Sequence, residues 1–225
     1  MKIRWIGQSG YVLSDEKNTI YIDPYLSDVV NRVTGRERMV NTPIEAENVK
    51  ADVVICTHNH LDHLDTDAIA QMKKDEILFL APTDCENTLK NLGAKRYQPF
   101  NEGDFSKVGE FELSAVYANH TVPAIGVLVS YDGIRMYFTG DTFYDEELTK
   151  IDCDILFVCI NGKLGNMNVA EAVNLTKRIK PKLGIPNHYG MFKSNTENPL
   201  NYTENIDCGF IMDFNREYEL KELIK

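Results

Sequence analysis

Three of the five histidines in this 225-residue chain lie between residues 58 and 63, in the run THNHLDH that spans residues 57–63. The run directly follows residues 51–56, a continuous apolar segment of the kind that forms a strand covered on both faces. Loops at the carboxyl ends of such strands are where α/β folds place functional groups. Imidazole and carboxylate groups both bind zinc-like cations. The sequence therefore predicts a cluster of metal-binding residue types in the loop directly after a buried strand.

The spacing inside the run favours two neighbouring ions over one. His58 and His60 are two residues apart, so both can point to the same side of an extended loop. Asp62 and His63 are adjacent, and they cannot easily join both earlier ligands on one small tetrahedral ion. We therefore expect His58 and His60 on one ion, and Asp62 and His63 on the other.

Each ion needs further ligands, and three candidates lie at the ends of other predicted strands: His120, Asp141 and His188. Alone, each is more typical of a packed or surface histidine or of a turn. A structural zinc site is disfavoured because Cys56 is the only cysteine near the run. Since the cluster at 58–63 needs more ligands, we predict that all three residues join it.

Apolar and polar alternation predicts strands in two runs, with helices interspersed. Asp132-Gly133 indicates a hairpin turn, and Asn168 followed by Glu171 indicates a helix start. Two sheets packed face to face, with helices outside, fit this pattern better than one doubly wound sheet. We expect strands at 2–6, 11–13, 19–22, 51–56, 77–80, 111–118, 125–131, 134–138, 155–160 and 183–186, a late edge strand at 210–214, and helices at 66–74, 83–92 and 168–179.

Composition limits the classes of function. The formal net charge of −10 disfavours general nucleic-acid binding, because the phosphate backbone attracts basic surfaces. No segment approaches the roughly 20 apolar residues that span a bilayer, and the first residues lack a signal-peptide pattern. Five cysteines, an odd number without CxxC spacing, favour a reduced, cytoplasmic protein. The length suits a single domain over residues 1–225.

Taken together, these motifs resemble the metallo-β-lactamase fold superfamily, which implies an α/β fold of the four-layer αββα type with a two-metal site at one edge. Within the superfamily, the chain is similar to the compact metal-dependent hydrolases that include L-ascorbate-6-phosphate lactonase. The resemblance rests on WIGQSGY at 5–11, Ile22-Asp23-Pro24, the run at 57–63, His120, Gly140-Asp141-Thr142, the segment 160–168 and PNHYGMF at 186–192.

The resemblance also implies a ligand set. By position, His58, His60 and His120 bind one ion, Asp62, His63 and His188 bind the other, and Asp141 bridges both. Asp23 supports the metal loop from behind, although an Asx turn before Pro24 explains it equally well. The ligands are all nitrogen or oxygen, so two divalent ions per chain are expected, zinc or manganese first and iron as an alternative.

Ligand chemistry predicts a metal-dependent hydrolase. Two divalent ions that share a water lower its pKa towards about 7, and Asp62 is the candidate catalytic group that steers the nucleophile or accepts a proton. Two such ions with two aspartates and a hydroxide leave a local charge of about +1, which favours a small anionic lactone, ester or phosphodiester. Candidate substrate contacts lie in the flanking loops: Asn161, Lys163, Tyr189 and Lys193.

Other activities of the same fold stay open. An iron-dependent oxidoreductase of the persulfide dioxygenase type uses a similar cage, and a nuclease or RNA-processing hydrolase is disfavoured by the acidic charge and the lack of a basic arm. A silent metal-binding module is disfavoured because every expected ligand is present. Residues 27–43, with Arg32, Arg36 and Arg38, form either a substrate lid or an ordinary surface loop. We expect no membrane partner, and the resemblance implies a homo-oligomer.

Overall fold

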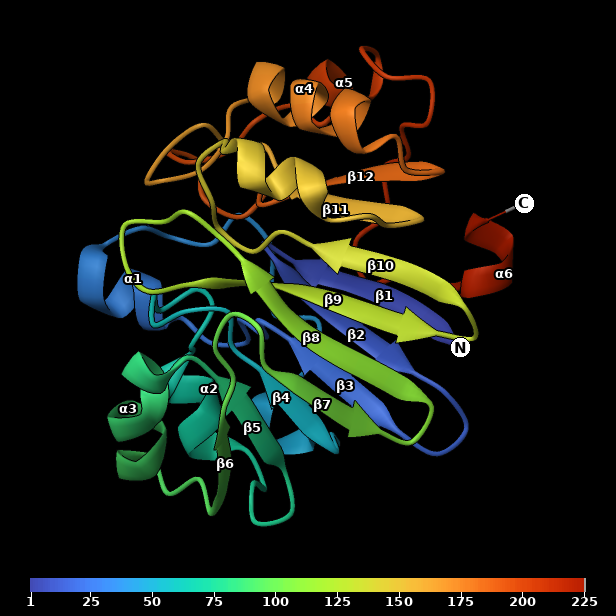
Figure 1. Ribbon diagram of the computed structural model, residues 1–225. Helices are drawn as coiled ribbons and strands as arrows, with labels where there is room; N and C mark the ends of the chain where they lie inside the picture. Colours follow the sequence, from blue (N-terminus) through green and yellow to red (C-terminus); the bar gives the residue numbers. More distant parts are fainter. Residues whose placement is uncertain (225) are drawn as a thin grey trace.

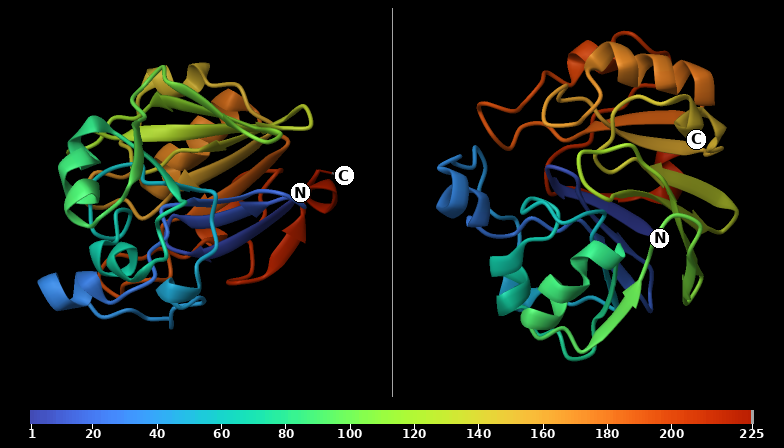
Figure 2. Two further views of the ribbon diagram at one scale, coloured as in Figure 1. Left: turned by 90° about the horizontal axis from the view of Figure 1, so that it is seen from below. Right: turned by 60° about the vertical axis from the view of Figure 1, so that its left-hand side comes forward.

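The computed structural model describes residues 1–224 and shows two β-sheets packed face to face between layers of helices (Figure 1). This four-layer arrangement confirms the αββα sandwich expected from the sequence. Both termini lie at one end of the sandwich, and helix α1 (Val29–Thr34) lies on the outside at the opposite end (Figure 2).

Within residues 1–224, the first sheet has seven strands in the spatial order β13-β1-β2-β3-β4-β5-β6. The pairs β3-β4, β4-β5 and β5-β6 are parallel. The pairs β13-β1, β1-β2 and β2-β3 are antiparallel. Their bounds are β1 (Lys2–Gly7), β2 (Gly10–Ser14), β3 (Thr19–Ile22), β4 (Val53–Ile55), β5 (Leu78–Ala81), β6 (Arg96–Pro99) and β13 (Glu217–Glu219).

Among the same described residues, the second sheet has six strands in the order β12-β11-β10-β9-β8-β7. A meander forms its antiparallel half, and the strands from β10 to β12 are parallel. The expected hairpin turn is present, because Asp132 and Gly133 both have positive φ. The bounds are β7 (Phe105–Val108), β8 (Phe111–Tyr117), β9 (Ile125–Tyr131), β10 (Ile134–Phe138), β11 (Ile155–Cys159) and β12 (Leu183–Asn187).

Helices cover the outer face of each sheet (Figure 1). Helices α2 (Thr66–Gln71) and α3 (Glu86–Asn91) cover the first sheet, and α4 (Val169–Ile179) and α5 (Leu200–Thr203) cover the second. The expected start of α4 is confirmed, because Asn168 and Glu171 form a reciprocal capping box. The remaining helical segments are α6 (Leu220–Leu223) and 3-10 turns at Ala46–Asn48, Thr83–Cys85 and Glu146–Lys150.

Side-chain alternation along the strands separates two cores. In β3, Ile20 and Ile22 enter the core between the sheets, whereas Tyr21 packs against the helix side. In β4, Ile55 faces the second sheet and Val54 faces α2 and α3. Because both faces of these central strands are buried, their sequences are continuously apolar, as expected for strands covered on both sides.

Some expected elements are wrong or were missed. Residues 210–214 alternate in polarity but form no strand; the chain there is held by single bonds such as Phe210 N to Gly184 O, and the edge strand is β13 instead. Strands β6 and β7 were not predicted, because both are short edge strands with partly exposed, mixed sequences. Helix α2 ends at Gln71, before the expected residue 74.

Two composition-based expectations can be compared with the structure. All five cysteines lie in the described part of the chain and are unpaired, and four of them are buried. None of the helices within residues 1–224 has the length and apolar character needed to cross a bilayer.

Candidate metal centre

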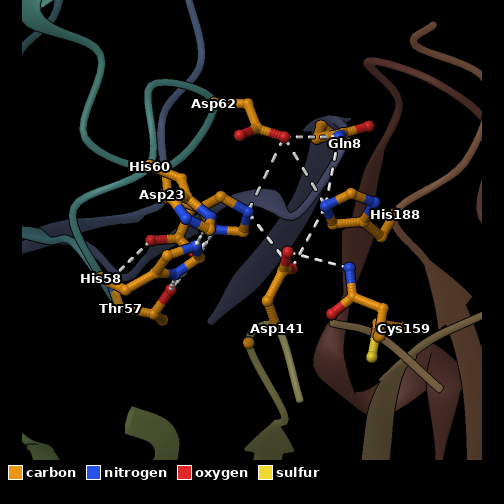
Figure 3. A network of polar contacts seen from close by, with 12 residues as sticks. Gln8, Asp23, Thr57, His58, His60, Asp62, Asp141, Cys159 and His188 are labelled. Carbon is orange, nitrogen blue, oxygen red and sulfur yellow. Dashed lines mark hydrogen bonds and ion pairs between the residues drawn. The ribbon is translucent and has the colours of Figure 1, made fainter. Parts of the chain in front are cut away.

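The seven candidate ligands converge where strands of both sheets end, and Figure 3 labels His58, His60, Asp62, Asp141 and His188 among them. The run at 57–63 follows β4 of the first sheet. His120, Asp141 and His188 follow β8, β10 and β12 of the second sheet. The side chains therefore meet at one edge of the sandwich, at the seam between the two sheets.

The first ligand group consists of His58, His60, His120 and Asp141, each offering one ligand atom within 4.8 Å of the others. His60 Nδ1 lies 3.0 Å from His58 Nε2 and 3.3 Å from His120 Nε2. Ligands placed about 2.0–2.1 Å from a tetrahedral ion are about 3.3 Å apart. The spacing of the three histidine nitrogens thus fits a single ion between them.

The second ligand group consists of Asp62, His63 and His188, again within 4.8 Å of one another. His188 Nε2 lies 3.6 Å from Asp62 Oδ2, and His63 Nε2 lies 3.9 Å from the same oxygen. Asp141 Oδ1 is 3.2 Å from the Nε2 atoms of both His63 and His188. Asp141 therefore touches both groups, as a bridging carboxylate must.

Buried polar atoms without partners show that this donor set suits a cation. Among the described residues, His63 Nε2 and Asp141 Oδ1 are buried and form no hydrogen bond. A buried polar atom left unsatisfied costs about 1–3 kcal/mol. Imidazole nitrogens and carboxylate oxygens that face one another without hydrogen bonds fit a divalent ion.

Hydrogen bonds behind the ligands fix their orientation. Asp23 Oδ2 lies 2.8 Å from His63 Nδ1, and the same carboxylate accepts bonds from the backbone and hydroxyl of Thr57 at 2.7 and 2.8 Å. The structure thus places Asp23 behind the metal loop, where the resemblance puts it. A contact of this type holds the far nitrogen of a ligand histidine and aims the near one.

The loop between β11 and α4 supports the other ligands. The carbonyl oxygen of Gly165 lies 3.0 Å from His120 Nδ1. The Asn166 amide donates to Asp141 Oδ2 at 2.8 Å, and its oxygen accepts from Thr142 N at 3.0 Å. Asp141 thereby keeps Oδ1 free on the side that faces the second group. The segment 160–168 was expected to matter only through the resemblance, and neither contact was predicted.

Three non-glycine residues around the second group have a left-handed backbone conformation. Gln8, Asp23 and His188 have positive φ angles of 53°, 45° and 58°. Non-glycine residues rarely adopt this conformation, and where they do it often marks a functional site. Gln8 was not predicted as a site residue, although its amide contacts Asp62; its only sequence signal is a polar residue in a tight turn after a buried strand.

In the metal-free protein, the histidines of the two ligand groups differ in their pKa values. Burial lowers the pKa of His58 well below its usual value, and it also lowers the pKa values of His60 and His120. Burial acts in the same direction on His63, but Asp141, Asp23 and Asp62 outweigh it and raise the pKa of His63 well above normal. The histidines of the first group are thus neutral and ready to bind an ion, whereas His63 holds a proton.

The pKa values of Asp141 and His188 follow the same balance. Burial alone raises the pKa of Asp141, but His188 and His63 overcome it and hold that pKa well below its usual range. Burial lowers the pKa of His188, yet the carboxylates of Asp141 and Asp62 raise it above its usual value. Negative charge on Asp141 is therefore stable between these two imidazoles.

The four candidate substrate contacts fall into two classes. Lys163 and Lys193 are exposed, and Lys163 Nζ donates to the Ser194 carbonyl at 2.9 Å. The Asn161 amide is buried and donates to Asn195 Oδ1 at 2.8 Å, so it joins the two loops that carry the lysines. The ring of Tyr189 is buried in the core, with its centroid 4.9 Å from that of Trp5. The lysines are thus exposed to solvent, whereas Asn161 and Tyr189 are buried, and all four substrate contacts stay predictions.

Residues 27–43 are fastened to the loop that follows His188. Met39 N donates to the Met191 carbonyl at 2.8 Å. The Arg38 guanidinium donates to the Ser27 carbonyl at 2.9 Å and lies 4.3 Å from the centroid of the Tyr25 ring. Tyr25 and Met191 belong to a small apolar cluster of their own. The segment thus lies as a pinned loop beside the metal centre.

Comparisons with known proteins agree with this fold and site. A family model for the β-lactamase superfamily domain matches residues 2–188. A UPF0173 metal-dependent hydrolase from Archaeoglobus fulgidus is 32% identical over 230 residues, which cover 92% of this chain and 90% of the relative. Igni18, a metallo hydrolase from Ignicoccus hospitalis, has a TM-score of 0.78 at 21% identity, covering 97% of this chain and 98% of that one.

A second solved structure shows how far the fold extends among hydrolases. The isothiocyanate hydrolase from Delia radicum gut bacteria has a TM-score of 0.78 at 17% identity and covers 98% of this chain and 99% of its own. Identity this low supports the shared fold alone, so family membership rests on the family model and the Archaeoglobus relative. On those two findings, this chain belongs to the metallo-β-lactamase superfamily, as a metal-dependent hydrolase of the UPF0173 family.

Proposed function

We propose that the chain is a hydrolase with two divalent ions that acts on a small anionic lactone, ester or phosphodiester. The observation that carries the proposal is the pair of adjacent ligand groups that share Asp141, whose buried Oδ1 lies 3.2 Å from Nε2 of both His63 and His188. A single ion cannot use all seven ligands, because the two groups occupy separate positions. Zinc and manganese are the ions we expect, since the ligands are all nitrogen or oxygen.

The residues around the ions differ in exposure and therefore in their roles. When bound, two divalent ions supply Lewis acidity and produce a nucleophile from water at neutral pH. Asp62 is the most exposed carboxylate of the site, with a side chain 19% accessible, so it is the ligand best placed to hold a proton or orient the attacking group. His60 and His120 are half-buried and so reach solvent in part, whereas His58, His63 and His188 are buried.

Charge around the opening favours an anionic substrate. The two ions outweigh the charges of Asp62 and Asp141, so the loaded site is locally positive on an acidic protein. Lys163 and Lys193 lie on two loops that contact each other through Asn161 and Asn195. The Lys163 loop also carries Gly165 and Asn166, which contact the ligands directly. We propose that both lysines attract the anionic group.

Metal analysis tests the dinuclear centre. We expect about two ions per wild-type chain, and the loss of at least one ion with nearly all turnover in His120→Ala and in Asp141→Ala. The exposed Asp207→Ala is a matched carboxylate control that keeps both ions. Retention of two ions in both ligand variants contradicts the assignment.

A substrate screen tests the reaction class. Phosphorylated lactones, cyclic nucleotides, thioesters and bis-aryl phosphates are offered to the zinc- and manganese-loaded forms. The Lys163→Ala/Lys193→Ala double variant should raise KM for an anionic substrate and leave a neutral ester unchanged. Dominant redox-active iron with oxygen consumption on a persulfide contradicts hydrolysis.

A further inference from the structure

The turn between β1 and β2 carries an unusual residue. Gly7 and Gly10 are paired across the hairpin, which leaves Gln8 and Ser9 as its two-residue loop. The φ angle of Gln8 is 53°, in the left-handed region. Glycine is preferred where such a loop needs positive φ, because the side chain of any other residue crowds the backbone there. A glutamine at this strained position therefore draws attention to the contacts of its side chain.

The backbone of Gln8 is tied to the last ligand of the second group. Its carbonyl oxygen accepts a hydrogen bond from His188 N at 3.1 Å and one from Trp5 Nε1 at 2.9 Å. His188 itself has a φ of 58°, so two left-handed residues from different sheets meet here. The turn thus holds the start of the His188 loop in a conformation that the loop does not favour alone.

The side chain of Gln8 is directed at Asp62 and His188, two ligands of the second group (Figure 3). It is fully buried, and its Nε2 donates to Asp62 Oδ2 at 2.8 Å. The same nitrogen lies 3.2 Å from His188 Nε2. Asp62 forms no other hydrogen bond within the described residues, and the nearest imidazole nitrogens, those of His188 and His63, lie farther from its Oδ2, at 3.6 and 3.9 Å.

We propose that Gln8 is a positioning residue for the second metal position, acting through Asp62 and His188 and not as a ligand itself. This inference rests on the dinuclear centre proposed above. The left-handed backbone at residue 8 points the amide into the seam between the sheets, and the amide fixes the Asp62 carboxylate at its distance from His188. Loss of such a contact typically weakens metal affinity by about 10–100-fold, and we expect this for the second ion alone.

Metal titrations of Gln8→Ala and Gln8→Gly test the proposal. Both variants should bind the first ion as the wild type does and the second ion about 10–100-fold more weakly. Because glycine adopts positive φ freely, metal-free Gln8→Gly should unfold at a temperature no lower than Gln8→Ala, which separates the side chain from the backbone. Ser9→Ala, a buried change in the same turn, is the matched control and should bind both ions normally.

The visible spectrum of the cobalt-loaded protein separates positioning from ligation. A positioning role predicts the same coordination number in wild-type protein and in both Gln8 variants once cobalt saturates them. A changed coordination number overturns the proposal, because it makes Gln8 a ligand, and so does unchanged affinity for the second ion. If the wild type binds only one ion, the dinuclear centre itself fails, and this inference fails with it.

Discussion

Nδ1 of His63 lies 2.8 Å from Oδ2 of Asp23, and both side chains are almost completely buried. Asp23 comes directly after β3, and His63 belongs to the loop after β4, its parallel neighbour. The same carboxylate accepts two hydrogen bonds from Thr57, at the start of that loop. One buried aspartate therefore holds both the first turn of the metal loop and the ring of one of its histidines.

Substitution of Asp23 should weaken metal binding without changing any ligand. Asp23→Asn keeps the shape but loses the charge that orients His63, so we expect a loss of about 10–100-fold in affinity for the second ion. Asp23→Ala also leaves buried donors of Thr57 unpaired, which costs about 1–3 kcal/mol for each group. Metal titration and thermal unfolding measure the two effects. An Asp23→Asn protein with wild-type affinity contradicts the role.

A methyl group at Gly165 should disturb the first ion. The Cβ of Gly165→Ala lies 2.7 Å from the His120 ring, closer than carbon atoms tolerate, and the φ of this glycine is 94°. We expect His120 to shift and the first ion to bind at least 10-fold more weakly, as for other lost supports of a ligand.

The matched control for that variant is Gly133→Ala. Gly133 has a φ of 76°, and no described atom lies within 4 Å of the added methyl group. This variant shares the backbone penalty of roughly 1–2 kcal/mol and should keep normal metal affinity. Equal affinity in the two alanine variants, measured by the same titration, contradicts the steric argument.

Binding of the second ion should release protons and strengthen as pH rises. Burial lowers the pKa of His63, but three aspartates raise it well above 6.5, so the metal-free side chain is protonated at neutral pH. An ion can bind Nε2 of His63 only after the proton on that nitrogen leaves. Calorimetric titration in two buffers of different ionisation enthalpy measures the release. The pKa values of the first-group histidines are lowered, so the first ion should show little proton release near pH 7.

The metal-free protein should lose stability as pH moves away from neutral in either direction. The lowered pKa values of His58, His60 and His120 give stability that is present above 6.5 and is lost as pH falls below it. The raised pKa of His63 gives stability that is full below 6.5 and is lost as pH rises through the raised value. The lowered pKa of Asp141 gives stability that is full above 3.8 and is lost as pH falls towards the lowered value. Thermal unfolding of the chelator-treated protein across pH should show both losses. A midpoint that is flat on the alkaline side contradicts the His63 contribution.

Arg38→Ala should loosen residues 27–43 without unfolding the protein. It removes the hydrogen bond to the Ser27 carbonyl and the contact with the Tyr25 ring, worth together about 1–3 kcal/mol. Hydrogen exchange should become about 10-fold faster or more in this segment. Arg32→Ala removes only an exposed pair with Asp67 and should change exchange little. Equal exchange in the two variants contradicts the pinned loop.

Much of the fold follows from local sequence patterns. The apolar run at 51–56 predicted a doubly covered strand, and the structure buries β4 between the second sheet and the helices. The capping box of Asn168 and the Asp132-Gly133 turn were also predictable, because each depends on contacts within a few residues. The edge strands β6 and β7 were not, since their exposed side chains carry no periodic signal.

The candidate site was predictable where the residue type itself carries the chemistry. The histidines and aspartates at strand ends were predicted from the sequence to form one cluster, and the structure brings them together. Gln8 and Asn166 could not be found in this way, because their contacts depend on how the two sheets meet. Tyr189 follows a residue with positive φ, which turns the chain, so its ring enters the core despite being next to a ligand.

Because the ligands come from both sheets, bound ions affect the folding stability of the protein and its resistance to proteases. Ions at this seam act as a removable cross-link between stretches of chain that are far apart in sequence, and metal-binding energy then becomes folding energy. A metal-starved cell would hold a chain whose sheets part more easily at this edge, and proteases would reach it sooner. We therefore expect the supply of ions to affect the amount of this protein as well as its activity.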